Sequence, residues 1–167
     1  MTDQAPKPVL RIANCSGFYG DRLSAAREMV EGGPIDFLTG DYLAELTLLI
    51  LWKMKQKDSN TGYALTFVRQ MEEVLVTCLD KGIKIVTNAG GLNPAALAAK
   101  MHELTDRLGL QARIAHIEGD DILAKLPELQ AAGEKLAHID TGRPLAGSGV
   151  QPIAANAYLG AWGIVEA

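Results

Sequence analysis

Residues 83–94 read IKIVTNAGGLNP, and this stretch decides how the chain folds. The run at 83–87 is apolar and β-branched, which predicts a buried strand that stops at Asn88. Asn93 then offers an N-cap, and Pro94 suits the first position of a helix that should continue to Leu108. A strand that passes through a short glycine-containing loop into a capped helix is a building unit of parallel sheets.

The same order of strand and helix repeats along the chain. Further strands are expected at 9–13, 35–39, 112–117 and 150–154, and helices at 23–30, 41–56 and 63–81. Asp21 and Asp41 are the expected N-caps of the first two helices, a short helix should follow Asp121, and Asn156 should open the last one. Residues 136–149 show no sustained period and predict a long loop or an irregular hairpin. We therefore expect an α/β fold, with a mostly parallel β-sheet and helices on both faces in a Rossmann-like three-layer arrangement, as a single domain over 1–167.

Composition limits the classes of protein to which the chain can belong. It has 167 residues with 48% hydrophobic and 22% charged types and a formal net charge of −4, which fits one globular domain and excludes wholesale disorder. An acidic chain without a cluster of basic residues is a poor nucleic-acid binder. Residues 1–8 lack the apolar core of a secretory signal, no stretch is long enough to span a membrane, and two cysteines are too few for a disulfide framework. These observations predict a cytoplasmic protein with no membrane or nucleic-acid partner.

Polar, glycine-containing segments follow the expected strands, and they form the expected ligand site. In open α/β sheets, ligands bind beyond the carboxyl ends of the strands. The predicted ligand-binding residues are Asn14, Ser16, Gly17, Asn88, Gly90, Gly91, Asn93, Asp121 and Asn156. The two glycines could hold an anionic group on backbone N–H groups, but the same composition also suits an ordinary tight turn. Tyr19, Arg22 and Tyr42 lie beside this cleft and could hold a carboxylate or phosphate.

Three residues are the predicted catalytic groups, namely Asp41, Asp120 and Cys15. The two aspartates could transfer protons, with the alternative that they only cap helices or lie in solvent. Cys15 lies at a strand end before a glycine, where a nearby helix N-terminus would lower its thiol pKa, whereas Cys78 belongs to an apolar helix stripe and predicts a core residue. His116 is expected to be a packed, hydrogen-bonded residue and not a catalytic one.

The sequence contains no motif that predicts a cofactor or metal site. The glycine loop matches neither the dinucleotide fingerprint nor the Walker A pattern, so no cofactor is predicted. Asp120, Asp121, Glu118, Asp41 and Glu45 could supply oxygen ligands for a divalent cation, but no motif supports a metal site, and none is predicted.

The helix expected at 41–56 is apolar almost all round. Such a helix should be buried on every side, which in a small domain predicts a further contact surface. We expect a homo-oligomer, or association with a further part of a longer protein.

Three stretches carry a family resemblance. They are IANCSGFYGDRLSAAREMVEGGPIDFLTGDYLAELT at 12–47, IVTNAGGLNPAALA at 85–98 and ANAYLGAWGIVEA at 155–167. Together they resemble the N-terminal part of the acyclic terpene utilisation family, the AtuA-type proteins, from about Leu10 to the last residue. The resemblance implies a link to the breakdown of acyclic terpenes such as citronellol and geraniol, whose intermediates are acyl-CoA thioesters. It also implies that this chain is the N-terminal domain of a longer architecture, and it assigns no residue a role.

Two functions are consistent with these observations. One is an enzyme, or an enzyme domain, acting on an acyl-CoA or a branched carboxylic acid in acyclic terpenoid catabolism. The other is a non-catalytic module that binds a ligand or holds a partner in an oligomeric complex. In both cases the expected ligand is a small anionic molecule or an acyl-CoA.

Overall fold

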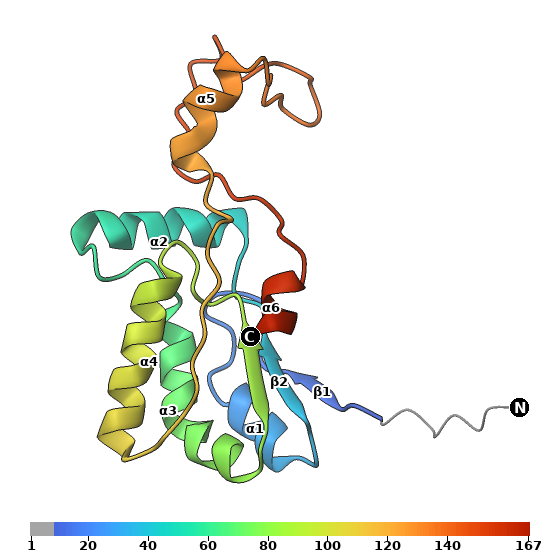
Figure 1. Ribbon diagram of the computed structural model, residues 1–167, viewed down its shortest axis with the longest axis vertical. Helices are drawn as coiled ribbons and strands as arrows, with labels where there is room; N and C mark the ends of the chain where they lie inside the picture. Colours follow the sequence, from blue (N-terminus) through green and yellow to red (C-terminus); the bar gives the residue numbers. More distant parts are fainter. Residues whose placement is uncertain (1–8) are drawn as a thin grey trace, which may run out of the picture. The chain divides into compact units, whose positions relative to one another are not determined.

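A computed structural model describes residues 9–167, which form two units, one ending at His116 and the other comprising Ile117–Ala167 (Figure 1). The prediction made for residues 1–8 lies outside the described residues.

A parallel sheet of three strands forms the centre of the first unit. The strands are β1 (Ile12–Asn14), β2 (Phe37–Gly40) and β3 (Lys84–Thr87), in the order β1-β2-β3. Asn14 pairs with Thr39, and Thr39 with Val86, so the three strands end at the same edge. The predicted α/β class with a parallel sheet is confirmed.

Four helices accompany these strands: α1 (Ala25–Glu31), α2 (Glu45–Lys57), α3 (Leu65–Asp80) and α4 (Pro94–Leu108). Helix α3 packs against α1, β3 and α4, and its apolar side contributes Phe67, Met71 and Val74 to the core. Figure 1 shows α3 and α4 running side by side. The predicted ends of α4 are confirmed, because the Asn93 side chain accepts from the N–H of Ala96 at the start and Gly109 follows at the end.

Two predicted N-caps are wrong. Helix α1 begins after Ser24 and helix α2 after Ala44, neither of which caps with its side chain. Asp21 and Asp41 instead bond to the loops at the sheet edge. Both helices begin later than the sequence predicted, so each aspartate lies four residues before the first helical residue and outside the N-cap position.

The strand predicted at 112–117 does not form. Ala112 and Ile114 are half-buried, whereas Gln111, Arg113 and Ala115 are exposed, so the predicted alternation exists. However, a strand also needs a neighbour for its backbone groups, and the sheet of the described chain contains only β1, β2 and β3. Periodicity therefore identified the packing of this segment but not its hydrogen bonding.

The second unit contains short elements, namely a 3₁₀ turn η1 (Leu123–Lys125), α5 (Leu126–Ala131) and α6 (Trp162–Glu166). The strand predicted at 150–154 is absent, and the pairing is reduced to one antiparallel bridge between Asp121 and Asn156. Asn156 therefore does not open a helix, and α6 begins only after Ala161. The loop predicted at 136–149 is confirmed.

The sequence predicted that the helix at 41–56 is buried on every side, but helix α2 is not. Its buried residues are Thr47 and Leu51, while Leu46 is 68% exposed. Between Val9 and Ala167, no helix combines the length and the apolar character that a membrane crossing requires.

Candidate functional site

Backbone and side-chain hydrogen bonds join the carboxyl ends of the three strands. The N–H of Cys15 donates to the carbonyl of Thr39 at 2.8 Å, and the N–H of Asp41 donates to the carbonyl of Ser16 at 3.0 Å. Thr87 Oγ1 donates to the carbonyl of Gly40 at 2.9 Å. The loops after β1, β2 and β3 therefore form one continuous polar edge, where the sequence predicted it.

A hollow of about 360 Å³ opens beside the end of β1. Its walls are Asn14, Cys15, Ser16, Gly17, Asp21, Arg22 and Ala25. The predicted ligand-binding residues of the first loop, Asn14, Ser16 and Gly17, thus lie together with Arg22. The sequence analysis predicted Asp21 as a helix cap and did not include it in this site.

Asp21 closes the loop that lines this hollow. Its carboxylate accepts from the N–H of Gly17 at 2.9 Å and from its neighbour Arg22 at 2.7 Å. The Gly17 hydrogen bond, followed by that of Arg22, lowers the pKa of the Asp21 carboxyl. The Arg22 guanidinium pairs with Glu28 at 2.9 Å, and both side chains are exposed, so a ligand can compete for this cation.

Asp41 and Asn88 form a bonded pair at the same edge. Asn88 Nδ2 donates to Asp41 Oδ1 at 2.6 Å, and Asn88 Oδ1 accepts from the N–H of Tyr42 at 2.8 Å. Since both ends of the amide are engaged, the orientation of Asn88 is fixed. The exposed Asp41 carboxylate is held in one place at the mouth of the strand ends.

A buried polar network lies beneath this edge. Tyr42 and Gln70 are each 1% exposed, and Tyr42 Oη donates a hydrogen bond to Gln70 Oε1. Gln70 Nε2 donates to the carbonyls of Cys15 at 3.4 Å and Arg22 at 3.3 Å. Gln70 on α3 therefore fixes both ends of the loop that lines the hollow.

Sequence reasoning missed Gln70. The signal was present, because Gln70 shares a helical face with Phe67 and Val74, three residues before it and four after it. An amide on a face that is otherwise apolar indicates a buried hydrogen-bonding role.

The pKa lowering predicted for Cys15 is wrong. The side chain is 3% exposed, with its Sγ 3.9 Å from Tyr42 Oη, and burial raises the pKa of the thiol. Burial also raises the pKa of Tyr42, and it raises that of Cys78 to about 11. Cys78 is a core residue, as predicted.

The loop at 88–93 is packed against protein. Gly91 donates its N–H to the carbonyl of Asn88 at 3.1 Å, and Leu92 donates to that of Gly62 at 2.9 Å. A Cβ on Gly91, whose φ is +55°, would collide with Leu51 and the Gly62 carbonyl, and one on Gly90 would lie 2.9 Å from Pro94. These contacts fit the ordinary tight turn that the sequence analysis gave as the alternative to an anion-binding loop.

Asn93 ties this loop to a neighbouring segment. Its Nδ2 donates to the carbonyls of Ser59 at 3.0 Å and Thr61 at 2.9 Å while Oδ1 caps α4. The predicted ligand residues Gly90, Gly91 and Asn93 thus have structural partners.

The remaining predicted site residues belong to the second unit. Asn156 Nδ2 donates to Asp120 Oδ2 at 3.0 Å, and Asp121 Oδ1 accepts from the N–H of Leu123 at 2.9 Å. Asp120 is therefore held by an asparagine, as Asp41 is in the first unit. Throughout the described part of the chain, no three His, Cys, Asp or Glu side chains gather as a metal site would require.

Comparison with known proteins gives one match. The family described as "Acyclic terpene utilisation family protein AtuA" matches residues 10–167. No curated protein matches the chain. No solved structure matches it either.

Proposed function

Because the chain belongs to the acyclic terpene utilisation family AtuA, we propose that it is an enzyme, or an enzyme domain, acting on an acyl-CoA or a branched carboxylic acid intermediate. Membership of this family supports a part in acyclic terpene utilisation. The observation that carries the proposal is the polar hollow beside the end of β1, at the sheet edge where α/β proteins bind ligands.

The polar end of the ligand is assigned to this hollow. Asn14 and Ser16 present hydrogen-bonding side chains there, and Arg22 supplies a cation that forms an exposed ion pair with Glu28. A carboxylate, a phosphate of CoA or a thioester oxygen could displace that ion pair, because exposed pairs contribute about 1 kcal/mol or less.

Asp41 is the proposed proton carrier of the first unit. Asn88 holds its carboxylate from one side and leaves it open to solvent on another. Asp120, held by Asn156, is the corresponding proposal for the second unit. Cys15 has no nucleophilic role in this scheme, since its thiol is buried and its pKa is raised.

A non-catalytic binding module is the second candidate. It is favoured by two observations: burial raises the pKa of the Cys15 thiol at the hollow, and the Asp41 carboxylate already has a protein partner. In this case the hollow would bind the same ligands without turnover.

A thermal-shift panel tests binding, using free CoA, branched and straight short-chain acyl-CoAs, the free acids, nucleotides and divalent metals. A ligand at 100 times its Kd stabilises the fold by about 2.7 kcal/mol. Arg22→Ala should abolish the shift, whereas Arg27→Ala, which changes an exposed arginine on the adjacent helix α1, should preserve it. A shift that survives Arg22→Ala would place the ligand elsewhere.

Turnover distinguishes the enzyme from the binding module. Asp41→Asn should retain binding and abolish turnover of the ligand that the panel identifies, with Asp106→Asn, at an exposed position of α4, as a matched control. Unchanged turnover in Asp41→Asn would remove this residue from the chemistry. Absence of turnover in the wild type, with binding intact, would support the module.

Self-association is also part of the proposal. Leu46 on α2 is 68% exposed and Trp162 on α6 is 84% exposed, and association would cover such side chains. Sedimentation equilibrium of the chain measures the mass, and a monomer at all concentrations would refute this part.

A further inference from the structure

The two units differ in charge. Residues 1–116 contain thirteen acidic and thirteen basic side chains, so their formal net charge is zero with histidines neutral. Residues 117–167 contain seven acidic and three basic side chains, and they therefore carry the whole net charge of −4. The second unit consequently attracts cationic molecules, whereas the first unit has no net preference for either sign.

The second unit also leaves most of its apolar side chains in contact with water. Of the hydrophobic side chains of residues 117–167, only Leu126 is buried, while Ile139 is 96% and Val150 is 66% exposed. A unit with so small a core gains stability when a partner covers its exposed apolar side chains.

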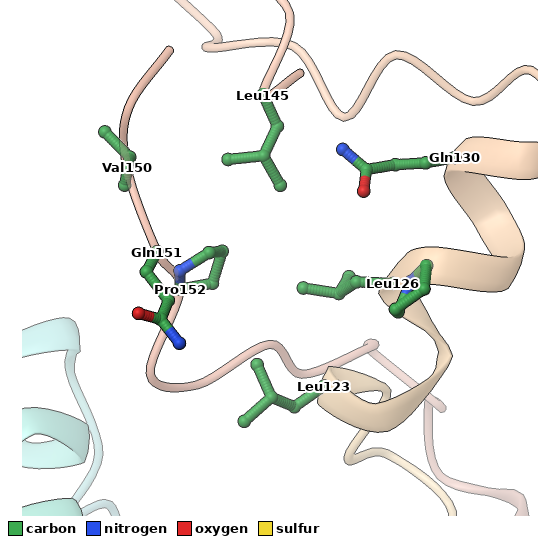
Figure 2. A pocket seen from close by; sticks show the side chains of 8 residues that line it. Leu123, Leu126, Gln130, Leu145, Val150, Gln151 and Pro152 are labelled. Atoms are coloured by element: carbon green, nitrogen blue, oxygen red, sulfur yellow. The ribbon is translucent and has the colours of Figure 1, made fainter. Parts of the chain in front are cut away.

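A hollow of about 420 Å³ lies between α5 and the loop at 136–149 with the residues that follow it (Figure 2). Figure 2 shows the side chains of Leu126 and Leu145 pointing into this hollow. Its eight lining residues are six apolar ones and two glutamines, namely Leu123, Leu126, Pro127, Leu145, Val150, Pro152, Gln130 and Gln151. Most of these walls are half-buried or exposed, so the hollow is open to apolar side chains that a protein partner lays on it and does not enclose a small molecule.

Acidic side chains accompany this apolar surface. Glu128 lies on α5 among the residues that line the hollow, Glu134 follows the end of that helix, and both are exposed. In the part of the chain that the structure describes, neither carboxylate forms an ion pair. The neighbouring Lys125 and Lys135 are already counted in the net charge of −4. A cationic side chain of a partner can therefore pair with either glutamate without first displacing another ion pair.

A partner segment must satisfy its own backbone hydrogen bonds here. Within residues 117–167, strand pairing is limited to one bridge between Asp121 and Asn156, so an extended peptide finds no strand edge to join. The hollow offers only the two glutamine amides as polar side chains. A helix bonds its own backbone groups and presents apolar side chains along one face, which is how amphipathic helices bind to apolar grooves.

We propose that this hollow and its acidic surroundings bind a basic, amphipathic helix of a partner protein. Apolar side chains of that helix occupy the hollow, and its lysines or arginines face Glu128 and Glu134. A second copy of this unit carries the same excess of negative charge, and the first unit is neutral, so neither has the complementary charge. The proposal does not depend on the ligand of the first unit.

Titration of the ¹⁵N-labelled full chain with a synthetic peptide of about 18 residues, or about five helical turns, tests the proposal. The peptide carries leucines at helical spacing and lysines at the other positions. Saturable shifts of the Leu126, Gln130 and Leu145 signals are expected. In one control peptide glutamate replaces every lysine, and in another the same residues follow an order without helical periodicity. Each control should bind at least about tenfold more weakly, and equal binding of either one would overturn the proposal.

Charge reversals locate the peptide. Glu128→Lys combined with Glu134→Lys should weaken binding about tenfold, the equivalent of two exposed charge pairs. Glu31→Lys combined with Glu73→Lys makes the same change in charge at exposed positions of α1 and α3, and the affinity should stay within about threefold. Equal losses in the two double variants would mean attraction to the chain as a whole and would overturn the proposal.

An uncharged substitution tests the apolar contact. Val150→Ser removes apolar surface from the rim of the hollow without a change in charge, so it should weaken binding about three- to tenfold with little change in Tm. An unchanged affinity would refute the assigned contact with the hollow.

Salt and protein concentration separate the remaining outcomes. Raising the salt from about 0.1 M to about 1 M shortens the Debye length from about 10 Å to about 3 Å and should weaken binding of the lysine peptide. An affinity that does not respond to salt would contradict the assigned charge contacts. If a higher protein concentration displaces the peptide, a second copy of the chain occupies the surface, and the assigned partner is wrong.

Discussion

Tyr42→Phe is the substitution that best tests the role of the buried network. It removes only Tyr42 Oη and leaves the ring, which packs edge-on against Phe67 with centroids 5.8 Å apart. Gln70 is 1% exposed, so its Oε1 acceptor would be left buried without its donor. Cys15 Sγ would also lose its neighbour Tyr42 Oη at 3.9 Å. A buried acceptor without a partner costs about 1–3 kcal/mol, so we expect a loss of about 2 kcal/mol in the free energy of unfolding.

Urea unfolding followed by circular dichroism measures this loss. In a chain of this length, about 2 kcal/mol corresponds to a decrease in Tm of about 4–8 °C. Tyr158→Phe is the matched control, because its side chain is fully exposed and the change should stay within about 0.5 kcal/mol. If the Tyr42→Phe variant is as stable as this control, the buried hydrogen bond between Tyr42 and Gln70 does not stabilise the fold.

A double-mutant cycle with Gln70→Met isolates the pair. Each single substitution leaves one buried polar atom without its partner, whereas the double variant removes both. The double variant should therefore lose less stability than the sum of the single variants, with a coupling of at least about 0.5 kcal/mol. Strict additivity would mean that the two side chains act independently. Because Gln70 also holds the loop from Cys15 to Arg22, Gln70→Met should in addition weaken any ligand bound in the first hollow.

Three further substitutions test the loops and the core. Gly91→Ala should cost clearly more than Gly82→Ala, because both have positive φ but only Gly91 has neighbours within reach of a Cβ; equal losses in urea unfolding would refute the packing argument. Since burial raises the Cys78 pKa from 9.0 to about 11, the unfolded thiol ionises first and stability should fall as the pH rises from about 9 to about 11; Cys78→Ala should flatten this part of the profile, and an unchanged slope would contradict it. Asn93→Ala should cost about 1–2 kcal/mol, because it removes the cap of α4 and both amide donors; a stability equal to that of the wild type in urea unfolding would contradict this role.

The sequence predicted a helix boundary correctly where the capping side chain and its hydrogen-bond partner are close together along the chain. Asn93 caps a helix that begins one residue later, and Pro94 needs no donor there, so four neighbouring residues determine this boundary. Asp41 had a comparable local signal and failed as a cap. Its partner is Asn88, forty-seven residues away along the chain, and no pattern around Asp41 contains that information.

The same reasoning explains the missing strands. Residues 112–117 have the alternation of a strand, and Ile114 packs against the core as that pattern requires. Pairing also depends on whether a free strand edge lies alongside, which only the three-dimensional arrangement decides. The sequence thus predicted the sheet edge and its first loop correctly, but not the buried amide of Gln70 or the apolar hollow between α5 and the loop at 136–149.

The two hollows differ in what supports them, and this difference has a consequence for experiments. Behind the first hollow lie side chains that are almost fully buried and bonded to one another, Tyr42 and Gln70. Substitutions there must change stability and ligand binding together. Around the second hollow the most buried lining residue, Leu126, is still 9% exposed, and Val150 is largely exposed. Rim substitutions there remove little packing, so a large change in ligand affinity with little change in Tm identifies a binding site that is not also a structural one.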